Sequence, residues 1–160
     1  MTEAVPTMAD TTARRHRIML LNGLNMTNLG RRDPHIYGTI GSLSELEELV
    51  RVTGEGLGVD VVAIHANDEG ALVDAIEEHD DIDGYLINPG GLWAYGLPTR
   101  IALTDTGRPT CEVHFANIYA TGHESIFTET VRGTVMGARE HGYVAALVAL
   151  VALLDAEHAG

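Results

Sequence analysis

The sequence predicts an α/β domain in which helices cover both faces of a doubly wound parallel sheet. Along the whole chain, short apolar segments of strand type alternate with segments that carry apolar residues at helical spacing. Such alternation is typical of βαβ units, and right-handed crossovers then place helices on both faces of one sheet. The chain has 160 residues, of which 45% are hydrophobic. This is the size of one domain with one substantial core.

The first half of the chain supplies two strands and two helices. Arg17–Leu21 is a short apolar strand, and a helix is expected over Ser42–Leu57 because Glu45 completes a capping box with the serine. The β-branched segment Val59–Ile64 predicts the second strand. A second helix follows at Glu69–Glu78, where apolar residues recur at helical spacing.

The second half continues the alternation. Tyr85–Ile87 is the third strand, and Leu97–Leu103 reads as a helix that tolerates a proline in its first turn. A fourth strand is expected at Pro109–His114, a further short one near Thr134–Met136, and a closing helix at Gly142–Glu157. The order of these elements favours a flavodoxin-like sheet in a single domain.

The ends and the cysteine content suggest where the protein works. Residues 1–16 are small and polar and predict a disordered tail, which leaves 17–160 as the domain. The single cysteine, Cys111, cannot form an internal disulfide and indicates a reducing compartment, so we expect a cytoplasmic protein. The longest apolar run, Tyr143–Leu154, is too short to cross a bilayer, and no membrane role is expected.

Charge and basic composition exclude several functions. The formal net charge is −13 and the ten basic residues are scattered, which disfavours nucleic acid as a partner. The sequence contains no lysine. A side-chain Schiff base and a conventional phosphate-binding P-loop both need a lysine amine. Chemistry on a carbonyl group must therefore proceed through an enol or enolate, and no cofactor site is predicted.

Three polar clusters follow strands of the predicted sheet. They are Asn22–Tyr37 after the first strand, Asn88–Gly91 after the third, and Glu112 with His114 at the end of the fourth. Ligands bind beyond the carboxyl ends of strands in open parallel sheets. Glu112 and His114 share a face of their strand, and the pair could be a satisfied hydrogen bond, an acid–base pair or two metal ligands. Without another convincing cluster of His or Cys, no metal is predicted.

The first of these clusters resembles the signature of the type II 3-dehydroquinate dehydratases. Asn22-Gly-Leu-Asn25, Leu29-Gly-Arg-Arg32, Pro34 and Tyr37-Gly38 match its successive parts, with Leu24 where the family usually has proline. The resemblance runs from Ile18 to Tyr143 with all three clusters in the family's order. It implies a flavodoxin-like hydro-lyase that acts on a small keto compound without a cofactor.

The resemblance also implies roles in proton transfer. Tyr37 matches a catalytic base that acts as tyrosinate, and Arg32 matches the arginine that favours this anion, since a free phenol has a pKa of about 10. Asn25 matches an asparagine that stabilises the developing enolate. His114, oriented by Glu112, matches the general acid that protonates the departing hydroxyl.

Further positions correspond to the family's substrate contacts. Asn88 matches a substrate-binding asparagine, and Leu29–Tyr37 matches a mobile lid. Large aromatic side chains are usually core residues, but Trp93 and Phe115 stand next to positions that align with substrate contacts. Both are therefore candidate binding residues.

Several of the expected polar contacts are replaced. Ala94 stands where the family has a histidine, and Ala116 where it has a serine. Thr121 and Ser125 stand in place of two arginines, and Ile101 replaces an acidic residue that reaches a neighbouring subunit. The proton-transfer set is thus kept while the groups that recognise hydroxyls and a carboxylate are reduced.

Three functions follow from this contrast. We expect an enolate-forming lyase or isomerase with a changed, less hydroxylated cyclic keto substrate. The alternative is an ordinary 3-dehydroquinate dehydratase in which His123 or Arg132 replaces the lost contacts. The third is a non-catalytic ligand-binding protein. In each case the resemblance implies a homo-oligomer, because family members assemble as trimers packed into dodecamers.

Overall fold

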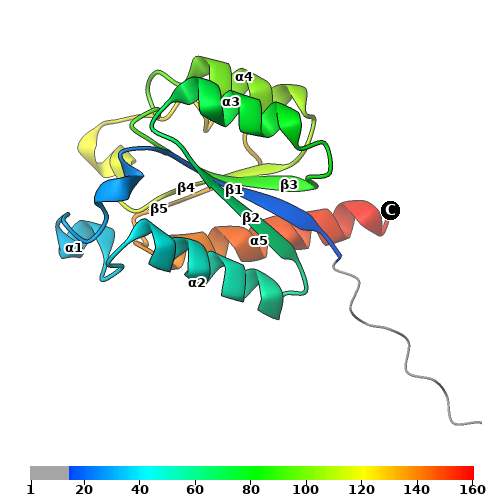
Figure 1. Cartoon of the computed structure of the whole chain (residues 1–160), viewed down its shortest axis with the longest axis horizontal. Coiled ribbons are helices and arrows are strands. Elements are labelled where there is room, and N and C mark those ends of the chain that lie inside the picture. The colour runs from blue at the N-terminus through cyan, green and yellow to red at the C-terminus, as the bar shows by residue number, and fades with distance from the viewer. Residues whose placement is uncertain (1–14) are drawn as a thin grey trace, which may run out of the picture.

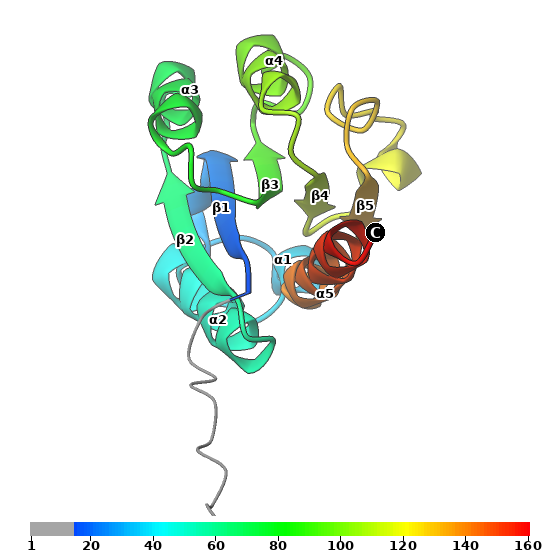
Figure 2. The ribbon, with the colours of Figure 1, turned by 90° about the vertical axis from the view of Figure 1, so that its right-hand side faces the viewer.

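A computed structural model describes residues 15–160, and it contains one five-stranded, all-parallel sheet. The strands lie in the order β2-β1-β3-β4-β5, which is the flavodoxin-like order (Figure 2). Their bounds are β1 Arg17–Leu24, β2 Asp60–His65, β3 Gly84–Gly90, β4 Thr110–His114 and β5 Gly133–Met136. The predicted fold class is confirmed.

Four helices cover the sheet in two layers. Figures 1 and 2 show α2 and α5 on one face and α3 and α4 on the other. Their bounds are α2 Leu43–Gly56, α3 Glu69–Glu78, α4 Leu97–Asp105 and α5 His141–His158. The short helix α1 and the 3-10 turns η1 and η2 lie in the loops after β1 and β4, over Pro34–Tyr37, Met26–Asn28 and Ile118–Thr121.

The inner strand β1 has one part of the hydrophobic core on each of its two faces. Ile18 and Leu20 pack with α2 and α5, whereas Met19 and Leu21 pack with α3 and α4. Successive side chains of a strand point to opposite faces, so a strand covered on both faces must be apolar throughout. All four side chains are fully buried. Each burial contributes about 1.5–3 kcal/mol, and together they hold the loop after β1 in a fixed position.

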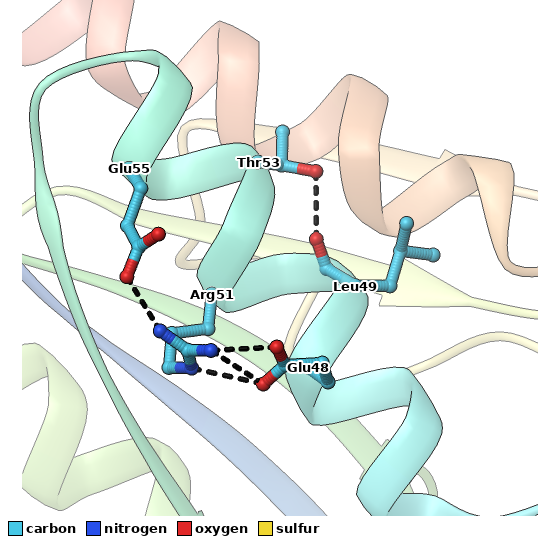
Figure 3. A network of polar contacts seen from close by, with 5 residues as sticks. All are labelled: Glu48, Leu49, Arg51, Thr53 and Glu55. Carbon is cyan, nitrogen blue, oxygen red and sulfur yellow. Dashed lines mark hydrogen bonds and ion pairs between the residues drawn. The ribbon is translucent and has the colours of Figure 1, made fainter.

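Polar side chains define the start and the exposed face of α2. Ser42 accepts a hydrogen bond from the Glu45 backbone N–H at 3.2 Å, as the capping box predicts. The Glu45 carboxylate accepts from the N–H of Gly41 at 2.7 Å, one residue before the cap. Figure 3 shows the solvent side of α2, where Arg51 donates to Glu48, about one turn before it, and to Glu55, about one turn after it.

Helix α5 is the core helix of the domain. By length and composition alone it could cross a membrane. Five of its apolar residues nevertheless belong to the core cluster that it forms with β1, β3 and β4, namely Ala146, Leu147, Leu150, Val151 and Leu154. A buried core helix passes the same test of composition, which explains the signal.

The structure moves several boundaries that the sequence predicted. β1 continues to Leu24 and β3 to Gly90, each three residues further than expected, and the stretch Leu29–Tyr37 contains the helix α1. Residues 1–14 of the predicted tail lie outside the described residues. Arg15 and His16, assigned to the same tail, are ordered: the Arg15 backbone N–H bonds to the Gly58 carbonyl, and His16 is 3% exposed. His16 Nε2 lies 2.8 Å from Asp155 Oδ1 on α5, and this contact joins the two ends of the domain.

Candidate active site

A cavity of about 190 Å³ opens where β1, β3 and β4 end. It lies at the carboxyl edge of the sheet, the edge at which the sequence predicted a ligand site. Five polar side chains line it: Asn25, Arg32, Tyr37, Asn88 and His114. The rest of its wall is formed by Leu24, Met26, Gly90, Gly91, Trp93, Phe115, Ala116 and Ile118.

A close approach of two loops positions Asn25. A side chain at Gly23 would place its Cβ 2.0 Å from the Pro89 carbonyl oxygen, so only glycine allows the end of β1 to lie against the end of β3. Asn25 follows in the left-handed region, with φ of 69°. Asparagine tolerates this conformation better than most residues. Its backbone N–H donates to Asn67 Oδ1 at 3.0 Å, which holds the turn in place.

Tyr37 is the last residue of α1 and reaches the cavity from the side. Asp33 caps this short helix by accepting from the His35 backbone N–H at 2.9 Å. The Arg32 guanidinium carbon lies 4.4 Å from the centroid of the Tyr37 ring, a cation–π contact. On another side the ring packs against Phe115, with centroids 5.7 Å apart. The tyrosine is therefore held between a cation and an apolar wall.

His114 and Glu112 form a buried hydrogen-bonded pair. His114 Nε2 lies 2.6 Å from Glu112 Oε1, and the glutamate is 0% exposed. The Thr128 hydroxyl donates to the other carboxylate oxygen at 2.7 Å. Burial raises the pKa of Glu112, but hydrogen bonds from His114, Ser125 and Thr128 together outweigh it and hold the pKa below its usual value. Since Nε2 faces the carboxylate, Nδ1 is the ring nitrogen left for a ligand.

Asn88 is the cavity residue that the surrounding protein holds most completely. Its Oδ1 accepts from the Gly90 backbone N–H at 2.9 Å, and its Nδ2 donates to the Tyr143 hydroxyl at 2.7 Å. Tyr143 in turn donates to Asn22 Oδ1 at 3.1 Å. Burial strongly raises the pKa of Tyr143, which keeps this phenol in its neutral, proton-donating form.

The structure brings most of the predicted site residues together. The predicted residues that line the cavity are Asn25, Arg32, Tyr37, Asn88, Trp93, His114, Phe115 and Ala116. Glu112 stands behind His114, where an orienting residue is expected. Phe115 is both a core and a lining residue, because it is 3% exposed and still borders the cavity.

Two predicted substrate contacts lie elsewhere. Ala94 does not border the cavity, although Gly91 and Trp93 of the same turn do. Ser125 is buried at 4% exposure beside Glu112, where its hydroxyl accepts from the Phe127 backbone N–H at 3.2 Å. Ile118, the first residue of η2, borders the cavity, whereas Ser125, four residues after the end of η2, does not. Ser125 therefore supports the glutamate and does not face a substrate.

Other residues of the site were not predicted to have a role in it. Leu24, Met26 and Ile118 form apolar wall, and Thr128 and Tyr143 act behind His114 and Asn88. Tyr143 is separated from Asn88 by 55 residues along the chain, so no local spacing could reveal their contact. Within residues 15–160, no three His, Cys, Asp or Glu side chains gather in a way that could hold a metal ion.

The fold and the cavity define an α/β domain of the flavodoxin-like kind with a candidate acid–base site at its sheet edge. A family model described as dehydroquinase class II matches residues 16–151. The chain belongs to this family of hydro-lyases, and the resemblance seen in the sequence is confirmed.

Curated relatives and solved structures agree with this assignment. The chain is 36% identical over 135 residues to a 3-dehydroquinate dehydratase from Roseiflexus castenholzii, covering 82% of this chain and 85% of that protein. It is 35% identical over 139 residues to a Bacillus cereus protein of the same name, covering 84% and 94%. The crystal structure of a type II dehydroquinase from Propionibacterium acnes superposes with a TM-score of 0.78 at 33% identity, covering 86% and 97%.

Proposed function

We propose that this protein eliminates water from a cyclic β-hydroxy ketone through an enolate. Tyr37, as tyrosinate, removes the proton from the carbon next to the carbonyl, and the electron pair of that C–H bond forms the enolate. When the enolate collapses, the C–O bond of the β-hydroxyl breaks and a carbon–carbon double bond forms. His114 gives its proton to the departing hydroxyl, which leaves as water. The observation that carries this proposal is that Tyr37 and His114 line one cavity.

The neighbours of the two residues have matching electrostatic roles. The positively charged guanidinium of Arg32 lies next to the Tyr37 ring, where it can attract negative charge that develops on the substrate or on the tyrosine during proton transfer. The carboxylate of Glu112 occupies Nε2 of His114 and orients the ring, which leaves Nδ1 as the nitrogen that can serve the leaving group. Asn25 and Asn88 offer hydrogen bonds where charge develops on the carbonyl oxygen or where hydroxyls bind.

We further propose a substrate with fewer hydroxyl groups than 3-dehydroquinate. Arg32 is the one arginine among the lining residues described, and its guanidinium lies against Tyr37. Trp93, Phe115 and Ile118 form much of the apolar wall. An apolar wall leaves the hydroxyls of a polyhydroxylated ligand without partners, which is costly when they are buried.

The second candidate is 3-dehydroquinate itself, which the names of the curated relatives favour. Of the two residues expected to replace the lost contacts, Arg132 is unsuited, because it pairs with Glu157 near the far end of α5 at 2.7 Å. His123 is better placed. Its ring packs edge-on against Trp93 at 5.0 Å, beside the cavity. If 3-dehydroquinate is the substrate, His123→Ala should raise KM with kcat largely kept.

The deciding experiment follows enone absorbance after 3-dehydroquinate, or an analogue lacking one ring hydroxyl, is mixed with the protein. Tyr37→Phe is the control, and its circular dichroism should match that of the wild type. The proposal predicts that the analogue is used with the higher kcat/KM and that Tyr37→Phe lowers kcat by at least about 10²-fold, as expected for loss of a general base. Preference for 3-dehydroquinate would establish the second candidate. A folded protein that uses neither compound would support the ligand-binding function.

Assembly and compartment belong to the same proposal. We propose a homo-oligomer built from trimers, as in a dodecamer. Exposed apolar side chains gather around the start of α4, at Tyr95, Leu97 and Ile101, and such groups are typical of subunit contacts. We also propose a cytoplasmic protein, in keeping with the free, buried Cys111.

A further inference from the structure

A buried tyrosine behind the cavity joins the ends of the two central strands. Tyr143 on α5 is 0% exposed, and its hydroxyl contacts Asn88 of β3 at 2.7 Å and Asn22 of β1 at 3.1 Å. Asn22 and Asn88 are direct partners in the register of these strands. Asn22 Nδ2 is buried and has no hydrogen-bond partner among the described residues. The tyrosine is therefore the described side chain that holds both amides.

The direction of each bond in this series is fixed by chemistry. The Gly90 backbone N–H can only donate, so the Asn88 oxygen must face Gly90 and its NH₂ group must face Tyr143. The hydroxyl accepts a hydrogen bond from that NH₂ group and donates one to Asn22 Oδ1. If the Asn88 amide were turned over, its NH₂ group would face the Gly90 N–H, and two donors would oppose each other. The partly buried N–H of Gly90 would then lose its acceptor, which is costly.

This arrangement decides what Asn88 can offer to a ligand. The amide carries two N–H donors, of which Tyr143 accepts one. Asn88 also borders the cavity. The second N–H is thus the group that remains for the ligand, and an oxygen of the ligand must accept from it.

We propose that Tyr143 is a positioning residue that sets Asn88 to donate a hydrogen bond to a substrate oxygen. The identity of that substrate rests on the proposed function, whereas the orientation of Asn88 is a property of the free protein. Tyr143 does not itself border the cavity, so it acts through the asparagine.

The variant Tyr143→Phe isolates the hydroxyl. The Tyr143 ring packs on Phe115 with centroids 5.3 Å apart, and Phe115 packs on Tyr37. Phenylalanine keeps these ring contacts and removes only the oxygen. Tyr85→Phe is the matched control, because Tyr85 is 1% exposed and belongs to the other core, under α3 and α4.

The first test uses the ligand-free protein labelled with ¹⁵N. The side-chain NH₂ signal of Asn88 is assigned by its loss in Asn88→Asp, and the solvent exchange of its two protons is measured. In the wild type we expect one of the two protons to be protected from exchange. In Tyr143→Phe the same proton should exchange about tenfold faster, which is the factor that one ordinary hydrogen bond represents. Tyr85→Phe should leave it unchanged. Equal protection in Tyr143→Phe and the wild type would overturn the proposal.

A second variant covers the case in which Tyr143→Phe fails to fold. Asn22→Ala removes the acceptor of the Tyr143 proton, which frees the hydroxyl to rotate, and the same Asn88 proton should exchange faster. Unchanged exchange in this variant counts against the proposal.

Kinetics separate this inference from the proposed function. With whichever compound the wild type uses, Tyr143→Phe should raise KM about tenfold with kcat within about twofold, and it should have no further effect in an Asn88→Ala background. An equal effect in that background would show that the tyrosine does not act through Asn88. If the wild type uses neither compound, the proposed function fails, and the exchange measurement alone decides the role of Tyr143.

Discussion

At the scale of single residues, the site depends on the negative charge of one buried carboxylate, that of Glu112. Glu112 has no exposure and yet keeps its pKa below the usual value, because three hydrogen bonds outweigh the cost of burial. A glutamate held as an anion in this way can orient the His114 ring. We therefore expect the same carboxylate to contribute to folding as well as to the proposed chemistry.

Glu112→Gln should destabilise the protein in a pH-dependent way. The folded pKa of Glu112 lies below the unfolded one, so its contribution is complete above the unfolded value of about 4.3 and is lost as pH falls through the lowered folded pKa. Urea unfolding should show a gap between wild type and variant at pH 7 that narrows toward about pH 3. The variant's kcat should fall about ten- to hundredfold, as for other orienting partners.

A suitable control for this measurement is Glu78→Gln at the exposed end of α3. Its unfolding free energy should differ little from that of the wild type over the same pH range. A gap for Glu112→Gln that stays constant from pH 7 to about pH 3 would mean that the charge of Glu112 does not stabilise the fold.

The limits of sequence reasoning are also clearest at single residues. Asn25, Tyr37, Asn88 and His114 could be placed in one site because each lies in a motif at the end of a strand, where the topology brings loops together. Ser125 could not be placed correctly. Its role depends on the path of the chain through η2, which leads it behind Glu112, and no spacing encodes that path.

At the scale of elements, the position of Tyr37, the proposed base, depends on the four-residue helix α1. A helix this short is not stable alone, so its ends must be held by neighbours. Asp33 caps its start, and the N–H of Gly38 bonds back to the Pro34 carbonyl at its end. Gly38 has φ of 75° and ψ of −164°, a conformation that is essentially restricted to glycine. The backbone conformation after Tyr37 thus explains why the motif Tyr37-Gly38 needs a glycine at its second position.

Gly38→Ala should displace α1 and lower both stability and activity. A Cβ at this position would lie 1.6 Å from Glu140 Oε2, and the backbone strain alone costs about 1–3 kcal/mol. We expect a clear loss in the free energy of unfolding and a lower kcat. Adding Glu140→Ala should recover only part of the loss, because it removes the collision and leaves the strain.

Gly56→Ala provides the comparison for Gly38→Ala. Gly56 ends α2, and a Cβ there would meet no atom within 4 Å. Alanine should be neutral or stabilise by up to about 1 kcal/mol in a helix. Similar unfolding energies for Gly38→Ala and the wild type would contradict the argument from strain.

At the scale of the whole molecule, sheet order could be predicted because alternation and crossover handedness leave few arrangements. Assembly is different, since it depends on surfaces that a single chain leaves open. Ile101 is 49% exposed on α4, next to Tyr95 and Leu97. Exposed apolar side chains gathered in this way lose contact with water when a second copy covers them, which favours association.

Association of identical chains must overcome repulsion, because each carries a formal charge of −13. We therefore expect light scattering to give a mass that is a multiple of 17.2 kDa and an assembly that tightens with added salt, as screening weakens the repulsion. Leu97→Glu should lower the mass, since it adds charge and removes apolar area from the proposed contact. Val52→Glu, at a residue 51% exposed on α2, should not. A monomer at all salt concentrations, or equal masses for Leu97→Glu and the wild type, would show that this surface does not join subunits.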